Sequence, residues 1–309
     1  MIDKKIGFIG VGNMASAMIR GILSSGLVAS ENVCGSCLHT ESARARADEL
    51  GVCVGTSNAE VVKASDVVFL TCKPYQLADV FVGSCGSSGV RELFDENKLI
   101  VSVVAGVKLR DIEAMLVCGG DQEDKRICDF KIIRCMPNTP AFVGAGVTSY
   151  CANKNLSVDS DASQDCADEN LNASGAQDCA LDCGQDCALV EQLFGTFGTV
   201  ERISEDQMDA VTAVGGSSPA FVYAFIEALA DGGVAEGLPR ATAQRIAAQT
   251  VLGSAKMVLE SGKHPAVLKD EVCSPAGTTI RGMEALERGA FRGTVIDAVR
   301  AAVRASRVL

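Results

Sequence analysis

The stretch that decides the fold is Ile6-Gly7-Phe8-Ile9-Gly10-Val11-Gly12-Asn13-Met14-Ala15, near the start of a 309-residue chain. An apolar run typical of a strand leads into glycines spaced as G-x-G-x-x-A, and a helical pattern follows. Gly10 permits a tight turn, Gly12 lets the backbone approach a pyrophosphate, and Ala15 allows close helix–strand packing. The stretch therefore predicts a dinucleotide-binding turn at a helix N-terminus, with ordinary turn glycines as the plainer alternative.

Outward from this turn, short apolar runs alternate with helical patterns such as 15–25 and 40–50. Nearly continuous apolar runs are expected for parallel strands that are buried on both faces. Strands are predicted at 5–9, 32–35, 66–71, 98–104 and 131–135. The alternation predicts a doubly wound α/β sheet.

Beyond about residue 205 the strand patterns stop and only helical patterns remain. Helices are predicted at 206–231, 242–260, 278–288 and 294–307. The fold class is therefore α/β followed by all-α, with domains at 1–204 and 205–309. About a hundred residues bury little surface alone, so we expect the Ala-rich helices to pack against a second copy of the chain.

A low-complexity insertion at about 155–188 interrupts the first domain. Gln-Asp-Cys-Ala occurs there three times, and few large apolar residues are present, so a surface loop is predicted. Cys179, Cys183 and Cys187 would share one face of a helix, and soft metals favour such thiolates. The segment lacks the C-x-x-C pairs of structural zinc sites, so no metal site is predicted.

Composition narrows the function classes. Hydrophobic residues make up 48% of the chain and charged residues 22%, as in a globular protein. The net charge of -11 argues against a nucleic-acid partner. We found no export signal and no apolar run near 18 residues, so no membrane partner is expected, and the fourteen cysteines are expected to be reduced thiols in the cytoplasm.

The choice of cofactor depends on the end of the second predicted strand. NAD-preferring sites usually carry an acidic residue there, and residues 33–40 contain none. Groups suited to a 2′-phosphate are Ser36, His39, Thr40, Arg44 and Arg46. NADP(H) is therefore favoured and NAD(H) stays open, because the two arginines fit a solvated helix face equally well.

Five segments in this order resemble pyrroline-5-carboxylate reductases. They are 7–14, Cys72-Lys73-Pro74, Met136-Pro137-Asn138-Thr139-Pro140, 213–221 and 270–279. The resemblance implies a Rossmann domain followed by a helical domain that forms a homodimer, with further assembly of dimers. It also implies the last step of proline biosynthesis, in which a reduced nicotinamide cofactor reduces 1-pyrroline-5-carboxylate.

The resemblance also assigns site residues. Those implied for the cofactor are Gly10, Gly12, Asn13, Met14, Ser36, Asn58, Cys72, Lys73, Pro74, Ala105 and Gly106. Those implied for the substrate are Asn138, Ser274, Gly277, Thr278 and Thr279. For Lys73, a solvent-facing loop lysine is an equal alternative.

The segment 274–279 fits a substrate carboxylate, because a Ser-Pro start, a glycine and two threonines precede a helix. We expect the backbone N–H groups of Gly277 and Thr278 to bind the carboxylate. The Thr279 hydroxyl is expected near the ring nitrogen, as the catalytic group. Taken alone, the segment also reads as a plain helix cap.

Two other functions are considered. One is suggested by residues that differ from the family's usual pattern, and the other by a second enzyme family with the same two-domain organisation. Three residues depart from the family's usual pattern. Ser218 and Ala276 stand where glycine is usual, and Cys273 stands where threonine or serine is usual. These departures motivate a non-catalytic NADPH-binding regulatory protein. A β-hydroxyacid dehydrogenase shares the two-domain plan, but the predicted helix at 217–226 lacks the lysine that such enzymes carry.

Overall fold

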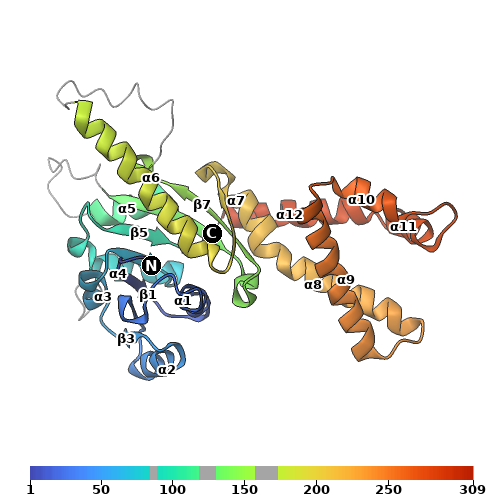
Figure 1. Ribbon diagram of the computed structural model, residues 1–309, viewed down its shortest axis with the longest axis horizontal. Helices are drawn as coiled ribbons and strands as arrows, with labels where there is room; N and C mark the ends of the chain where they lie inside the picture. Colours follow the sequence, from blue (N-terminus) through green and yellow to red (C-terminus); the bar gives the residue numbers. More distant parts are fainter. Residues whose placement is uncertain (84–88, 118–129, 157–172, 309) are drawn as a thin grey trace. The chain divides into compact units, whose positions relative to one another are not determined.

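The structure is a computed structural model that describes residues 1–83, 89–117, 130–156 and 173–308 (Figure 1). Its contacts divide the chain into two units, Met1–Gly216 and Ser217–Val308. The division falls later than the predicted break after residue 204. The reason is that residues just after 204 pack with the first unit, where Met208 and Ala213 are fully or almost fully buried.

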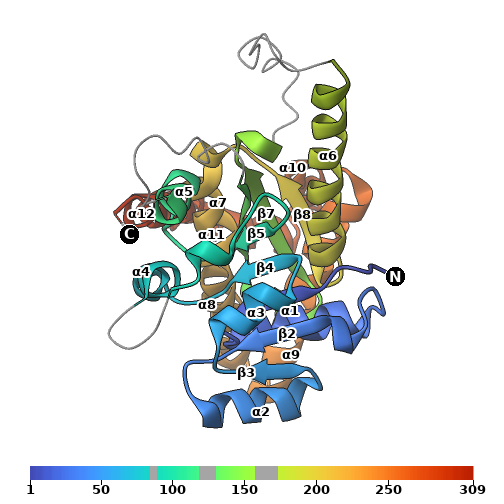
Figure 2. The same cartoon turned by 90° about the vertical axis from the view of Figure 1, so that its left-hand side faces the viewer.

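One mixed sheet forms the centre of the first unit (Figure 2). Its strand order is β3-β2-β1-β4-β5-β6-β7-β8, and all neighbours are parallel except β6 and β7. The strands are β1 Ile6–Ile9, β2 Val33–Ser36, β3 Cys53–Gly55, β4 Val67–Leu70, β5 Leu99–Ser102, β6 Lys131–Pro137, β7 Gly146–Ala152 and β8 Gly198–Arg202. The five predicted strands are confirmed to within a few residues.

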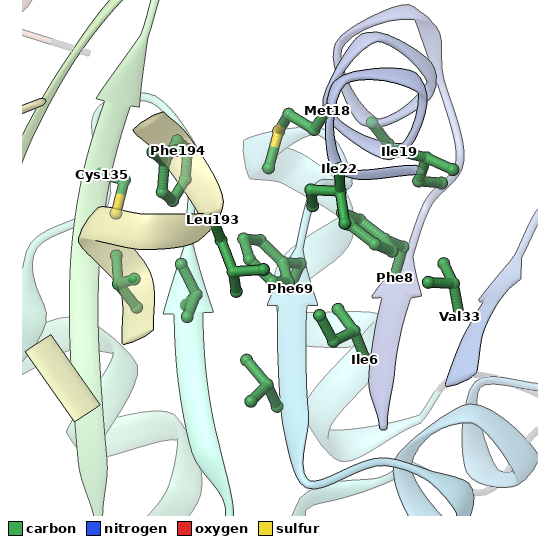
Figure 3. Close-up of a cluster of buried hydrophobic side chains, with 14 of the residues drawn as sticks. Ile6, Phe8, Met18, Ile19, Ile22, Val33, Phe69, Cys135, Leu193 and Phe194 are labelled. Atoms are coloured by element: carbon green, nitrogen blue, oxygen red, sulfur yellow. The ribbon is translucent and has the colours of Figure 1, made fainter. Parts of the chain in front are cut away.

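Two apolar clusters cover the two faces of the sheet, which makes the unit doubly wound. On one face, Phe8 of β1 stacks on Phe69 of β4 with ring centroids 4.7 Å apart, and Phe194 lies 5.9 Å from Phe69 (Figure 3). Helices α1 Asn13–Ser24, α2 Thr40–Leu50 and α6 Ala173–Gly195 pack on this face. Helices α3 Asn58–Ala64, α4 Leu77–Val82, α5 Leu109–Val117 and α7 Met208–Val211 pack on the other.

The prediction of a loop at 155–188 is wrong for residues 173–188, which are helical. Residues from Ala173 onward continue α6 toward its N-terminus. The C-terminal half of α6 is anchored, because Cys187 is buried with its thiol 3.8 Å from the Leu156 carbonyl. Helix formation propagates cheaply from such an anchored segment through residues like Ala, Gln and Leu. The rest of the insertion, 157–172, lies outside the described residues.

The second unit is helical throughout, as predicted. Its helices are α8 Ser218–Ala235, α9 Arg240–Ser261, α10 Pro265–Val272, α11 Thr278–Arg288 and α12 Phe291–Ser306. Its buried core is small and consists of Ala230, Ala243 and Ala247, with Ile226 and Val234 against them. Large side chains such as Leu252 and Leu259 stay exposed, and exposed apolar side chains in number are typical of a surface that another molecule covers.

Within the described residues, the helical stretch Glu205–Ala235 has the length and composition of a membrane span, with a mean hydropathy of 1.2. One such helix does not by itself establish a membrane protein. The same composition suits a helix that is covered by another protein chain.

Candidate active site

The turn between β1 and α1 has the shape of an anion cradle. Gly10 has a φ of +94°, and a Cβ added there would lie 3.0 Å from backbone atoms of Cys72. The Gly10 and Val11 N–H groups donate to the Ser36 carbonyl at 3.1 and 2.8 Å. At Gly12, by contrast, nothing lies within 4 Å of an added Cβ. The turn is thus tightly packed against Cys72 at Gly10, whereas there is free space beside Gly12.

The start of α1 fits the pyrophosphate of a dinucleotide. Gly12 is the N-cap residue, no side chain caps the helix, and no acidic residue lies in the first turn. The first N–H groups of a helix have no partners within it, and the helix dipole favours an anion there. The Met14 side chain packs against the core, and a contact of Met14 with the cofactor stays a prediction.

Ser36 and Asn58, both predicted for the cofactor, contact each other. The Ser36 hydroxyl donates to Asn58 Oδ1 at 2.7 Å, and Ser36 is only 1% exposed. A hydroxyl has one proton to donate. Ser36 therefore orients Asn58 in this arrangement and does not present a donor to a 2′-phosphate, while His39 and Thr40 are exposed at the start of α2.

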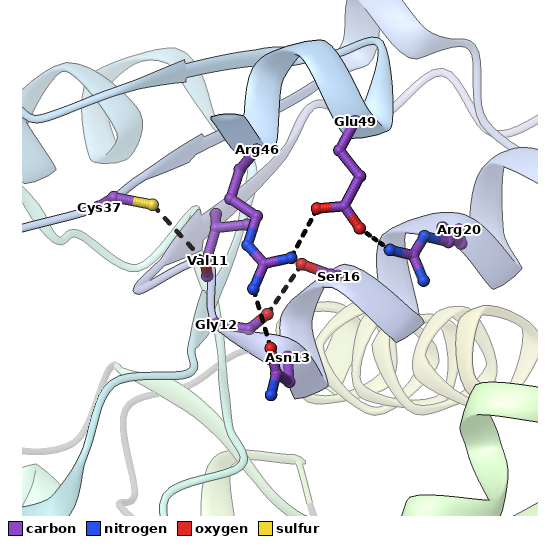
Figure 4. Close-up of polar contacts among 8 residues, drawn as sticks. All are labelled: Val11, Gly12, Asn13, Ser16, Arg20, Cys37, Arg46 and Glu49. Carbon is purple, nitrogen blue, oxygen red and sulfur yellow. Dashed lines mark hydrogen bonds and ion pairs between the residues drawn. The ribbon is translucent and has the colours of Figure 1, made fainter. Parts of the chain in front are cut away.

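Arg46 does not lie free on a solvated helix face. Its Nη2 donates to Asn13 Oδ1 at 2.8 Å, and its Nη1 contacts Glu49 Oε2 at 2.6 Å (Figure 4). The other carboxylate oxygen of Glu49 pairs with Arg20 of α1. Sequence reasoning missed the roles of Glu49 and Arg20, although the i,i+3 spacing of Arg46 and Glu49 was a usable signal. Arg44 is exposed.

The residues predicted at the nicotinamide end follow two neighbouring parallel strands. Cys72-Lys73-Pro74 comes after β4, and Ala105-Gly106 comes after β5. Both therefore lie at the carboxyl edge of the sheet, as the Gly10 turn does. Burial raises the pKa of the Cys72 thiol to about 11, so the thiol is protonated at neutral pH. Lys73 is exposed, and its contact with the cofactor stays a prediction.

Asn138 is buried and its amide is bound by backbone groups. Its Oδ1 accepts from the Val147 N–H at 3.0 Å, and its Nδ2 donates to the Gly215 carbonyl at 3.1 Å. The side chain thus ties the end of β6 to β7 and to the π-helical segment Thr212–Ser217. Such π segments are common at functional sites. A direct contact of Asn138 with substrate stays a prediction.

In the second unit, the predicted substrate residues form one turn and the start of α11. The Gly277 N–H donates to the Ser274 carbonyl at 3.1 Å, and its contact with a substrate carboxylate stays a prediction. Gly277 is the N-cap residue, without a side-chain cap. The N–H groups at the first helical positions, Thr278 and Thr279, have no partner within the helix. The N–H groups of Thr278 and Thr279 are therefore candidate donors to an anion.

Ala276 adopts a left-handed backbone with a φ of +59°. A glycine, which the resemblance implies at this position, would adopt this conformation without strain, because residues other than Gly, Asn and Asp rarely visit this region. Among the described residues, no group of three or more His, Cys, Asp or Glu is placed to hold a metal ion.

Two family models match the chain. The pyrroline-5-carboxylate reductase dimerisation model matches residues 205–309, and the NADP oxidoreductase coenzyme F420-dependent model matches residues 5–106. The pyrroline-5-carboxylate reductase of Arabidopsis thaliana is 39% identical over 305 residues, covering 99% of this chain and 95% of the relative. That of Escherichia coli strain K12 is 39% identical over 308 residues, covering 100% and 99%.

Solved structures give the same result. The Plasmodium falciparum pyrroline carboxylate reductase with NADP bound is 30% identical, with a TM-score of 0.76, covering 100% of this chain and 98% of that one. The Streptococcus pyogenes enzyme is 31% identical, with a TM-score of 0.75 and coverage of 99% of both chains. The protein belongs to the pyrroline-5-carboxylate reductase family.

Proposed function

We propose that the protein reduces 1-pyrroline-5-carboxylate to proline with NADPH, as the last step of proline biosynthesis. The observation that carries the proposal is the match to curated reductases of this name along the whole chain. That match includes both the β1–α1 turn and the turn before α11. NADP(H) is the favoured cofactor, since a relative of similar fold has NADP bound.

The first unit supplies the cofactor site. The N–H groups at the start of α1 would hold the pyrophosphate, and the open space above Gly12 would admit it. The Ser36–Asn58 pair would approach the adenosine ribose. Cys72-Lys73-Pro74 and Ala105-Gly106 would border the nicotinamide. When bound, the cofactor supplies a hydride to the imine carbon of the substrate.

The second unit supplies substrate contacts. The N–H groups of Thr278 and Thr279 at the start of α11 would hold the carboxylate, since the helix end is uncapped. The Thr279 hydroxyl would hydrogen-bond the ring nitrogen and orient the ring. The imine enters protonated, so its nitrogen ends as the amine of proline and no strong acid is required.

The protein would act as a homodimer through its helical unit, with dimers assembled further. Support comes from the match to a dimerisation model and from the exposed apolar side chains of that unit. We propose that the protein is a soluble enzyme of the cytoplasm.

The test is NADPH oxidation by the purified protein in the presence of 1-pyrroline-5-carboxylate, repeated with NADH. Thr279→Val removes one hydroxyl at nearly constant shape, and we expect it to lower kcat/KM by at least about tenfold. Thr278→Val is the matched variant, since Thr278 is exposed and would act through its backbone. NADPH binding without oxidation would contradict the proposal and favour the regulatory protein that Ser218, Cys273 and Ala276 suggest.

A further inference from the structure

Of the residues that the structure describes, only Arg46 hydrogen-bonds the Asn13 side chain. Its Nη2 lies 2.8 Å from Asn13 Oδ1. Among the described residues, Asn13 Nδ2 has no partner, and it points away from the guanidinium (Figure 4). Asn13 is the first residue of α1, directly after Gly12.

An amide side chain has two chemically opposite ends. Its oxygen accepts hydrogen bonds and its nitrogen donates them, while a guanidinium only donates. Arg46 can therefore bind only the oxygen of Asn13, and this leaves the NH₂ group for another partner. With the amide reversed, its oxygen would face any anion at the start of α1 and repel it.

Arg46 is itself held in place. Its Nη1 contacts Glu49 Oε2 at 2.6 Å, and Glu49 also pairs with Arg20 one helix away. Only a quarter of the Arg46 side chain is exposed. Each of the two Nη atoms of Arg46 already has a partner, Asn13 or Glu49, so Arg46 is better suited to orient a neighbour than to bind a phosphate.

We propose that Arg46 is a positioning residue for the dinucleotide: it fixes the Asn13 amide with its NH₂ group toward the pyrophosphate. The inference rests on the proposed cofactor site and deepens it. It differs from a role of Arg46 at the 2′-phosphate in one measurable respect. The pyrophosphate is common to NADPH and NADH, whereas only NADPH carries the 2′-phosphate.

The experiment measures the Kd of NADPH and of NADH by nicotinamide fluorescence, without substrate. We expect Arg46→Met to raise both Kd values by a similar factor, roughly three- to tenfold, as for loss of one hydrogen bond. Arg46→Lys keeps a donor and should recover part of the loss. In an Asn13→Ala background, Arg46→Met should have little further effect.

Three results would overturn the inference. One is a loss of NADPH affinity alone, which would mean a contact with the 2′-phosphate. Another is no change in either Kd. The third is a loss that is fully additive with Asn13→Ala, which would mean that Arg46 only holds α2 against α1; thermal unfolding of each variant would show this as a lower Tm.

Arg44→Met is the matched variant on the same helix, and it should leave the NADH Kd unchanged, because Arg44 is exposed. Cofactor binding is measured without 1-pyrroline-5-carboxylate, so failure of the proposed reduction would appear separately, as NADPH bound but not oxidised.

Discussion

Ala276 is a residue at which the removal of one methyl group should stabilise the protein. Its φ of +59° lies in the left-handed region, in the turn closed by the hydrogen bond from Gly277 N–H to the Ser274 carbonyl. An L-residue with a Cβ costs roughly 1–2 kcal/mol there relative to its favoured conformations. Glycine has no such penalty, although it gives the unfolded chain more freedom, at about 0.5–1 kcal/mol.

We therefore expect Ala276→Gly to raise the free energy of unfolding by roughly 0.5–1 kcal/mol, and the Tm by about 1–2 °C. Little buried area is lost, because Ala276 is exposed. The assay is thermal and urea unfolding of both proteins at the same protomer concentration, since a dimer's stability depends on concentration.

Ala290 provides a matched variant. Its φ is +53°, and it precedes α12 outside the 274–277 turn, so Ala290→Gly should stabilise the protein similarly. If Ala290→Gly stabilises the protein and Ala276→Gly does not, the left-handed turn at Ala276 is absent in solution. Gly277→Ala should lower the free energy of unfolding, because a Cβ on residue 277 would lie 2.2 Å from the Ser274 hydroxyl oxygen.

Further predictions concern the first unit. Gly10→Ala places a Cβ at 3.0 Å from the Cys72 backbone at a φ of +94°, so we expect a loss of about 2 kcal/mol in urea unfolding and weaker NADPH binding by fluorescence. Glu205→Ala removes the acceptor of Leu109 N–H at 2.7 Å and the partner of the buried Arg134 at 3.1 Å; a loss of roughly 2 kcal/mol is expected, and an unchanged urea midpoint would contradict this. Burial raises the pKa of Cys72 to about 11 from 9.0, so its contribution to stability is present below about pH 9 and is lost as the pH rises toward 11. Urea midpoints at about pH 8 and about pH 10.5 should show the decrease, and Cys72→Ala should reduce it.

The sheet was readable from the sequence where its strands are buried on both faces. β1, β4 and β5 are apolar at nearly every position and show complete burial, so the apolar runs located them. β8 could not be found in this way, because its residues Gly198–Arg202 are mostly exposed and carry no apolar pattern. The short helix α10 also buries no residue, so its sequence lacks a core-facing stripe.

The sequence located the segments that form the candidate site, but it did not predict the hydrogen bonds between them. The glycine spacing located the β1–α1 turn, since its geometry is required by the backbone itself. The partners of Ser36, Asn138 and the Gly277 N–H depend on which groups the tertiary structure brings near, and no local pattern encodes them. The helix in the second part of the insertion was likewise set by the packing of Cys187 and its neighbours on the sheet.

The most direct test of the reductase claim follows the hydride itself. The protein is mixed with 1-pyrroline-5-carboxylate and NADPH that carries deuterium at the transferable position, and the product is analysed by mass spectrometry and NMR. We predict proline with one deuterium on the ring carbon that belonged to the imine, formed in step with NADP⁺. Unlabelled proline, or labelled cofactor left intact beside unreacted imine, would contradict the account.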